Sequence, residues 1–144
     1  MKKYETLHLV KSEDLNHHGT LFAARATAWL IEAGFAAVAC EHGNPNEIVL
    51  RGMQDMSFCK PVEKGSVIRY EGQVVQVGNT SLIVCVKAIS AISKEEYLKG
   101  FITFVTIDEN TSEKKVHGIS LDETQDTEEL REREMALKIV ANRN

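Results

Sequence analysis

An alanine-rich stretch at residues 21–40 constrains the fold of this chain more than any other part of the sequence. It contains no proline, a single glycine and eight alanines, and most of its other residues favour helices. An uninterrupted helix of this length extends about 30 Å, which is enough to cross a small domain. The sequence therefore predicts one long central helix.

The residue types along this helix predict two faces. Apolar residues recur at alternating steps of three and four, which predicts a stripe directed at the core. The stripe consists of Leu21, Ala24, Ala28, Ile31, Phe35 and Val38. A second face holds Arg25, Trp29 and Glu32, which are spaced i, i+4 and i+7, and we expect Trp29 to pack there. The many small residues let other backbone approach closely, as a helix wrapped by a sheet requires.

A membrane-spanning helix is the alternative interpretation of an apolar run of this length. Arg25 and Glu32 lie well inside the run, and a charge at the centre of a membrane helix costs roughly 2.5–3.5 kcal/mol. No basic cluster flanks the run to orient it. We therefore interpret the run as a core helix and expect no membrane partner.

Length and composition predict one globular domain. The chain has 144 residues, of which 43% are hydrophobic, so it can bury one sizeable core. Its 17 basic and 21 acidic residues give a net charge of −4, without a basic block to follow a phosphate backbone. We therefore expect no nucleic-acid partner. No apolar run follows the two N-terminal lysines, so we expect no secretory signal and a cytoplasmic protein.

Three cysteines are too few and too widely spaced to predict a disulfide framework or a metal site. Cys40, Cys59 and Cys85 show neither a CxxC motif nor Cys/His ligand spacing. We expect them to be buried thiols without a chemical role.

Outside the helix, the hydrophobic period changes to two and predicts strands. The predicted strands are residues 4–10, 48–58, 67–77, 80–89 and 101–107, with a short edge at 115–117. Gly78 and Asn79 predict a tight hairpin between the third and fourth strands. One early helix followed by sequential antiparallel strands predicts an α+β fold in which a curved sheet wraps the helix.

The C-terminal segment predicts a second, shorter helix. Asp126 and Glu129 form a capping signature, and acidic residues precede basic ones along the segment. Its apolar positions Leu130, Leu137 and Val140 form a narrow stripe, which favours a mostly solvated helix on one edge and leaves a partner-binding helix as the alternative. We expect a main domain at residues 1–121 and a helical extension at 122–144.

Several motifs together resemble the hotdog-fold acyl-CoA thioesterases, also called acyl-CoA hydrolases. These motifs are Asn-x-x-Gly-Thr-Leu-Phe at 16–22, Trp29 with Glu32-Ala33, Phe58-x-Lys60-Pro61-Val62-x-x-Gly65, Val77-Gly78-Asn79-Thr80-Ser81, and Thr103-Phe104-Val105. The resemblance covers residues 4–121. It implies a sheet wrapped around the central helix, a dimer that often assembles into hexamers, active sites at the dimer interface, and a pantetheine thioester such as acyl-CoA as the substrate.

The sequence departs from the pattern of this family in two places. Many relatives have Gly-Gly where this chain has Ala23-Ala24, and an acidic residue where it has Ile31. That acidic position is generally taken as the catalytic carboxylate. Because a helix turns about 100° per residue, Glu32 cannot occupy the same place without a different substrate pose.

Thioester hydrolysis requires an activated water and donors that stabilise the oxyanion. We expect those donors to be unpaired backbone N–H groups near Gly19, Thr20 and Leu21, at the positive end of the helix dipole. Gly19 would let the ligand approach, or would merely permit the turn. The hypothesis for the base is Glu32, and its alternative is an ion pair with Arg25 or with a partner subunit.

The remaining candidate residues flank this position. The resemblance places Asn16 in the active site, where its amide would orient the water, although it would also serve as a helix cap. His17 and His18 are candidate bases or simply polar surface. The candidates for substrate binding are His18, Thr20, Leu21 and Phe22, together with Thr80 and Ser81 near the pantetheine or nucleotide entrance.

The sequence thus predicts a hydrolase that releases a free acid and a thiol, with coenzyme A present only as part of the substrate. A non-catalytic protein that binds or senses acyl-CoA is the alternative, and Ile31 is the residue in its favour. A hydratase or dehydratase is less favoured, because the His-containing motifs of those families are absent.

Overall fold

A computed structural model describes residues 1–143, and Asn144 lies outside the described part of the chain. The elements in chain order are β1 (Lys3–Leu9), α1 (Ala23–His42), β2 (Ile48–Phe58), β3 (Val67–Val77), β4 (Ser81–Ser90), β5 (Glu96–Thr106) and α2 (Thr127–Ala141). Short 3₁₀ turns, Ser12–Asp14 and Pro45–Glu47, precede and follow α1. The predicted α+β architecture, with one long helix, an antiparallel sheet and a C-terminal helix, is confirmed.

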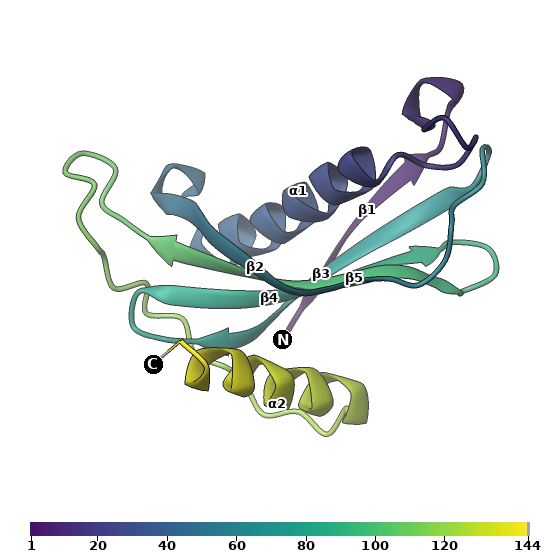
Figure 1. Cartoon of the computed structure of the whole chain (residues 1–144). Coiled ribbons are helices and arrows are strands. Elements are labelled where there is room, and N and C mark those ends of the chain that lie inside the picture. The colour runs from purple at the N-terminus through teal and green to yellow at the C-terminus, as the bar shows by residue number, and fades with distance from the viewer. Residues whose placement is uncertain (144) are drawn as a thin grey trace.

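The five strands form one antiparallel sheet in the order β1-β3-β4-β5-β2. Figure 1 shows α1 lying across one face of this twisted sheet and α2 packed on the opposite face. β2 is an edge strand that pairs only with β5, and bulges interrupt its register after Leu50 and after Gln54. Val49 and Leu50 on this edge are 40% and 42% exposed. One side of β2 therefore remains free to pair with another strand.

The long helix begins two residues later than predicted. Leu21 and Phe22 are not helical, because the N–H of Leu21 donates to the Val62 carbonyl and the N–H of Phe22 to the Asp14 carbonyl. Phe22 has extended backbone and precedes the first helical residue. At the other end, Gly43 ends α1 in the left-handed conformation, at a φ of 89°.

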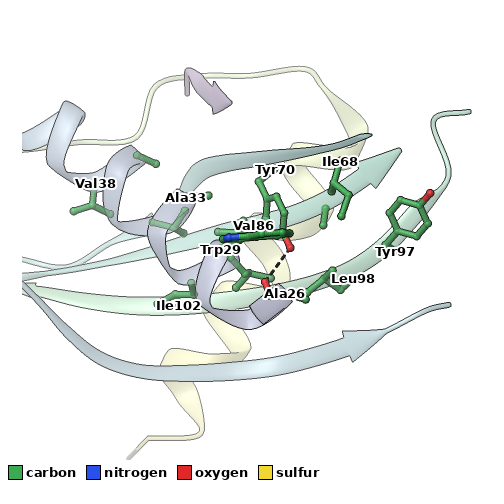
Figure 2. Packing of buried hydrophobic residues seen from close by; sticks show 14 of the residues in the cluster. Ala26, Trp29, Ala33, Val38, Ile68, Tyr70, Val86, Tyr97, Leu98 and Ile102 are labelled. Carbon is green, nitrogen blue, oxygen red and sulfur yellow. Dashed lines mark hydrogen bonds between the residues drawn. The ribbon is translucent and has the colours of Figure 1, made fainter. Parts of the chain in front are cut away.

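The core face of α1 differs from the predicted stripe. The buried residues are Ala26, Trp29, Leu30, Ala33, Gly34, Ala37 and Val38. Ala24 and Ala28 are exposed, and Ile31 and Phe35 are half-buried. Four of the seven buried residues, Ala26, Ala33, Gly34 and Ala37, are small, and they permit a close approach between the helix and the sheet. Figure 2 shows Ala26, Ala33 and Val38 beside the buried side chains of the sheet.

Close packing between α1 and the sheet depends on a glycine in β3. A Cβ built on Gly72 would lie 3.0 Å from the Ala33 carbonyl oxygen and 3.1 Å from the Ala37 Cβ. Trp29 packs against the same strand, as expected, since its indole lies at a right angle to the Tyr70 ring and is stacked on the His8 ring at 4.3 Å. The tryptophan thus belongs to the core rather than to a polar face.

By length and composition, α1 is the one helix within residues 1–143 that passes a test for a membrane span, with a mean hydropathy of 1.2. In the structure it lies on the sheet, and Leu30, Ala37 and Val38 are fully buried. It therefore serves as the core helix that the sequence predicted.

The C-terminal helix α2 begins at the predicted cap but packs on a different face. The Asp126 side chain accepts hydrogen bonds from two N–H groups of the first turn. Leu130 and Leu137 are 46% and 55% exposed, whereas Ala136 and Ile139 are buried against the sheet. The predicted leucine stripe is therefore not the packing face.

Charged residues hold α2 on the sheet. Glu132 is buried and pairs with the ammonium of Lys87 on β4, which is also buried. Glu129 is also buried and accepts hydrogen bonds from the N-terminal ammonium of Met1 and from Arg133. Burial alone would raise the pKa of Glu129, but these two cations lower it below its usual value. Ion pairs thus add to the apolar contact that Ala136 and Ile139 make with the sheet.

The cysteine prediction is correct for only one thiol. Cys85 is buried under α2, whereas Cys40 and Cys59 are exposed. Burial raises the pKa of Cys85 to about 12, which keeps the thiol protonated. Among residues 1–143, no three His, Cys, Asp or Glu side chains are grouped as a metal site requires.

Candidate active site

Asn16 organises the loop that leads into α1. Its side-chain oxygen accepts hydrogen bonds from the N–H groups of His18 and Thr20, at 2.8 Å and 3.2 Å. Its own N–H donates to the Thr20 carbonyl at 2.7 Å. The Asn16 amide nitrogen has one weak contact, 3.3 Å to the Thr20 hydroxyl, so it keeps the capacity to bind another group.

The backbone amides predicted to bind the oxyanion are already engaged. Gly19 donates to the Asn16 carbonyl, Thr20 to the Asn16 side chain, and Leu21 to the Val62 carbonyl. The prediction that these three N–H groups are free is therefore wrong. Gly19, at a φ of 82°, makes the turn that returns the chain toward the helix.

The free donors lie one turn further along the chain. Within residues 1–143, the N–H groups of Ala23, Ala24 and Arg25 have no acceptor, and Phe22 offers no side-chain cap. The first amide with a partner is that of Ala26, which donates to the Phe22 carbonyl. The three free amides stand at the positive end of a 20-residue helix. The Ala23-Ala24 pair was the signal for this position in the sequence, since it departs from the pattern of the relatives.

An ion pair between a buried carboxylate and a half-exposed guanidinium fixes the first turn of α1 to the preceding loop. Asp14 is 2% exposed, and its carboxylate lies 3.2 Å from the guanidinium of Arg25. The same carboxylate accepts a hydrogen bond from the Lys11 N–H at 2.9 Å. Arg25 therefore pairs with Asp14, and the alternative pairing with Glu32 is not formed.

A half-open cavity of about 240 Å³ lies beside the free amides. Its apolar lining comes from Leu21, Ala23, Ala26, Phe58, Val62 and Leu98. Figure 2 shows Ala26 on α1 close to Leu98 on β5, with Tyr97 beyond it. Ala23 both carries a free N–H and lines the cavity, so the free amides and the cavity lie next to each other at the start of α1.

The rim of this cavity carries the polar side chains of the segment after β2. The ammonium of Lys60 forms an ion pair with Glu95 and lies 5.7 Å from the centre of the Tyr97 ring. Burial and the Glu96 carboxylate raise the pKa of the Cys59 thiol. Cys59 is therefore protonated at neutral pH and is a poor nucleophile.

Glu32 lies apart from the free amides of its own subunit. It follows Ala23 by nine residues, which is about 13 Å along the helix axis. Glu32 is exposed on the side of α1 that is near His8 of β1. Burial lowers the pKa of His8, although the Glu32 and Asp14 carboxylates act to raise it. Ile31 projects from a different side and packs half-buried against the core.

Thr80 and Ser81 lie at the other end of the sheet. Leu9 pairs with Val67 near the start of α1, so the hairpin after Val77 stands at the far end of β3. There the Ser81 carbonyl contacts the His117 ring at 3.0 Å. Within one chain, Thr80 and Ser81 therefore lie far from Asn16, Gly19 and the other candidates near the start of α1.

The two candidate histidines remain on the surface of the loop. His17 and His18 are exposed, with their rings 3.9 Å apart. Phe22 is 52% exposed, Leu21 lines the cavity, and Thr20 is half-buried in the turn. The structure thus brings His18, Thr20, Leu21 and Phe22 together around the start of the helix.

A helix held across an antiparallel sheet, with its uncapped N-terminus beside an apolar cavity, defines a hotdog-type domain with a candidate acyl site. The family model of the thioesterase superfamily matches residues 18–96, more than half of the chain. The chain therefore belongs to the thioesterase superfamily. No protein among those of curated function matches it by sequence.

Several solved structures share the whole fold. A hexameric acyl-CoA thioesterase has 25% identity and a TM-score of 0.85, over 98% of this chain and 90% of that one. An acyl-CoA hydrolase from Bacillus cereus has 23% identity and a TM-score of 0.85, over 98% and 85%. An acyl-CoA hydrolase from Staphylococcus aureus, solved with butyryl coenzyme A, has 24% identity and a TM-score of 0.74, over 98% and 88%.

Proposed function

We propose that this protein is an acyl-CoA thioesterase, which hydrolyses the thioester to a free acid and coenzyme A. The observation that carries the proposal is the set of free amides at the start of α1, which opens onto an apolar cavity. Membership of the thioesterase superfamily and the likeness to acyl-CoA hydrolases support it.

In the proposed reaction, the thioester carbonyl oxygen accepts a hydrogen bond from the Ala23 N–H. Water attacks the carbonyl carbon, and negative charge develops on that oxygen at the positive end of the helix dipole. The tetrahedral intermediate collapses by breaking the carbon–sulfur bond, so the thiolate of coenzyme A leaves and the acid remains. This chemistry uses coenzyme A as part of the substrate and requires no metal.

A second subunit completes the proposed site. The free edge of β2 suits antiparallel pairing with its own copy, which would set two α1 helices side by side in opposite directions. We propose that Glu32 of the partner subunit activates the water, because Glu32 of the same subunit is too distant. The same two-fold arrangement brings Thr80 and Ser81 of the partner to the end of the sheet that carries Asn16. We propose a cytoplasmic homo-oligomer, and three of the similar structures are named as hexamers.

Asn16 is proposed to orient the attacking water through its amide nitrogen. That nitrogen has only the long contact with Thr20, whereas the side-chain oxygen is fully used within the loop. Because Asn16 also holds the loop, Asn16→Ala should lower both kcat and the melting temperature.

A non-catalytic acyl-CoA-binding protein is the second candidate. Ile31 is half-buried and apolar at a position where relatives are expected to carry an acid, and Glu32 is exposed on α1, close enough to His8 of β1 to influence the pKa of that ring. A protein with the oxyanion donors but without a base would hold a thioester without hydrolysing it.

A thiol-release assay over acyl-CoAs from acetyl to palmitoyl distinguishes these functions. The proposed function predicts stoichiometric release of coenzyme A, and saturable binding without release would favour the binding protein. Glu32→Gln should lower kcat by roughly 10²–10⁴ while leaving the melting temperature within a degree or two, since it removes a general base and keeps the shape. A faster Ile31→Asp variant together with an unaffected Glu32→Gln would exclude Glu32 as the base.

A further inference from the structure

We propose that Arg25 is a positioning residue for the reaction, which acts through Asp14 by neutralising a buried carboxylate that would otherwise oppose the oxyanion. The inference rests on the proposed thioesterase function, in which the free N–H of Ala23 binds the oxyanion. Its basis is the ion pair between the Asp14 carboxylate and the Arg25 guanidinium, which are 3.2 Å apart.

The Asp14 carboxylate lies beside the first turn of α1. The Asp14 carbonyl accepts a hydrogen bond from the Phe22 N–H at 2.8 Å, and Phe22 directly precedes Ala23. This hydrogen bond, with the covalent span of one residue on each side of it, limits the distance from the Asp14 carboxylate to the Ala23 nitrogen to about 11 Å. A full negative charge therefore stands within about two helical turns of the proposed oxyanion.

Arg25 is the main compensating charge for this carboxylate. Asp14 is 2% exposed, so water does little to screen its charge. Apart from the Arg25 guanidinium, the one cation within 4 Å of it among residues 1–143 is the ammonium of Lys11, which is 3.9 Å away and belongs to an exposed side chain. The Lys11 N–H also donates to the carboxylate at 2.9 Å, but an amide carries no net charge. Without Arg25, Asp14 would keep most of its negative charge at the start of α1.

An uncompensated carboxylate at this place would act against catalysis. The positive end of the helix dipole favours a negative charge at Ala23, whereas a second negative charge on Asp14 would repel it. A unit charge about 11 Å away, in surroundings of intermediate polarity, changes the rate by roughly tenfold. The ion pair with Arg25 removes this repulsion, so the field of the free amides acts on the oxyanion alone.

Substitutions of the two partners separate this charge effect from a purely structural contact. Asp14→Asn removes the charge and keeps a side-chain oxygen that can accept the Lys11 N–H. Arg25→Met removes the compensating cation and keeps a long side chain that favours the helix. Arg25→Lys keeps the cation, and the double variant Asp14→Asn/Arg25→Met removes both charges together.

The experiment measures kcat and KM for butyryl-CoA, well below the melting temperature of each variant. Arg25→Met should lower kcat by roughly tenfold, and Arg25→Lys should keep it within about threefold of the wild type. Asp14→Asn should raise kcat, by up to about tenfold, although loss of the ion pair lowers its melting temperature. The double variant should return kcat to within about threefold of the wild type. Arg131→Met removes a cation from an exposed position on α2 and should leave kcat as in the wild type.

A higher kcat in a less stable variant is the result that a purely structural contact does not give. If Arg25→Met keeps the kcat of the wild type, or if both single variants lower kcat and the double variant shows no recovery, the inference is overturned. A higher KM with an unchanged kcat for Arg25→Met would mean that the guanidinium binds the substrate itself, which also overturns it. If the wild type releases thiol from no acyl-CoA, the proposed function fails, whereas an active wild type with any of these contrary results overturns the inference alone.

Discussion

Replacing Gly72 by alanine should push α1 away from the sheet. The added Cβ would lie 3.0 Å from the Ala33 carbonyl oxygen and 3.1 Å from the Ala37 Cβ, whereas ordinary contacts begin at 3.4 Å. Both neighbours belong to a rigid helix, so the helix must shift rather than a flexible side chain. Overpacking of this kind costs about 1–3 kcal/mol, and removing a strand glycine returns about 0.5–1 kcal/mol.

The net loss for Gly72→Ala is thus about 1–2 kcal/mol, which lowers the melting temperature of a domain of this size by roughly 3–8 °C. Gly52→Ala is the matched control, because its Cβ would meet only the end of the flexible Gln54 side chain at 3.0 Å. Calorimetry on both variants gives the comparison. Equal melting temperatures for Gly72→Ala, Gly52→Ala and the wild type would refute the close packing of α1 on β3.

Three further outcomes follow from buried polar groups. Tyr70→Phe removes the hydroxyl that donates to a helix carbonyl at 2.9 Å and should lower the free energy of unfolding by about 1 kcal/mol in denaturant titrations. Glu132→Gln should destabilise the protein by about 3 kcal/mol, because it leaves buried Lys87 with Glu128 as its remaining partner. The double variant Lys87→Met/Glu132→Leu removes both buried charges and should regain most of that loss. The pKa of Glu129 is lowered in the folded state, so this carboxylate adds stability that is fully present above pH 4.5 and is lost as the pH falls below that value. In thermal melts, Glu129→Gln should make the melting temperature less dependent on pH in this acidic range.

The sequence predicted the elements well because their signals are local. An uninterrupted run of helix formers identified α1, alternation identified the strands, and Asp126 identified the start of α2. The prediction of the buried face of α1 was poorer. Ala24 and Ala26 are chemically identical, and the burial of Ala26 depends on how α1 packs on the sheet, where Ala33 and Ala37 lie against Gly72.

The packing of α2 was not readable from its own residues. Leu130 and Leu137 belong to the predicted apolar stripe and are exposed, whereas Glu129 and Glu132 are buried. Arg133 on the same helix is one partner of Glu129, but the other cations, the N-terminal ammonium for Glu129 and Lys87 on β4 for Glu132, come from distant parts of the chain. A buried glutamate therefore becomes visible only after the fold brings its partner to it.

The candidate site shows the same limit. The resemblance pointed to Asn16, and the turn before the helix pointed to Gly19, but the role of each backbone amide depends on long-range pairing. The Leu21 N–H donates to the carbonyl of Val62, which is forty-one residues away. Because of this contact, the first free N–H donor is that of Ala23. No short-range pattern reports such a contact.

The central claim, that the first free amide of α1 stabilises the oxyanion, is tested most directly by Ala23→Pro. Proline is well tolerated at the first position of a helix and lacks the N–H, and Phe22 before it already has the extended backbone that proline requires. Thr127→Pro makes the same change at the first position of α2 and serves as the control.

The measurement is kcat for thiol release from butyryl-CoA, with the melting temperature taken on the same preparations. The account predicts that Ala23→Pro lowers kcat by roughly 10²–10³ without lowering the melting temperature, as loss of one oxyanion donor does, while Thr127→Pro keeps the kcat of the wild type. An Ala23→Pro protein that is folded and hydrolyses butyryl-CoA at the rate of the wild type would contradict the claim.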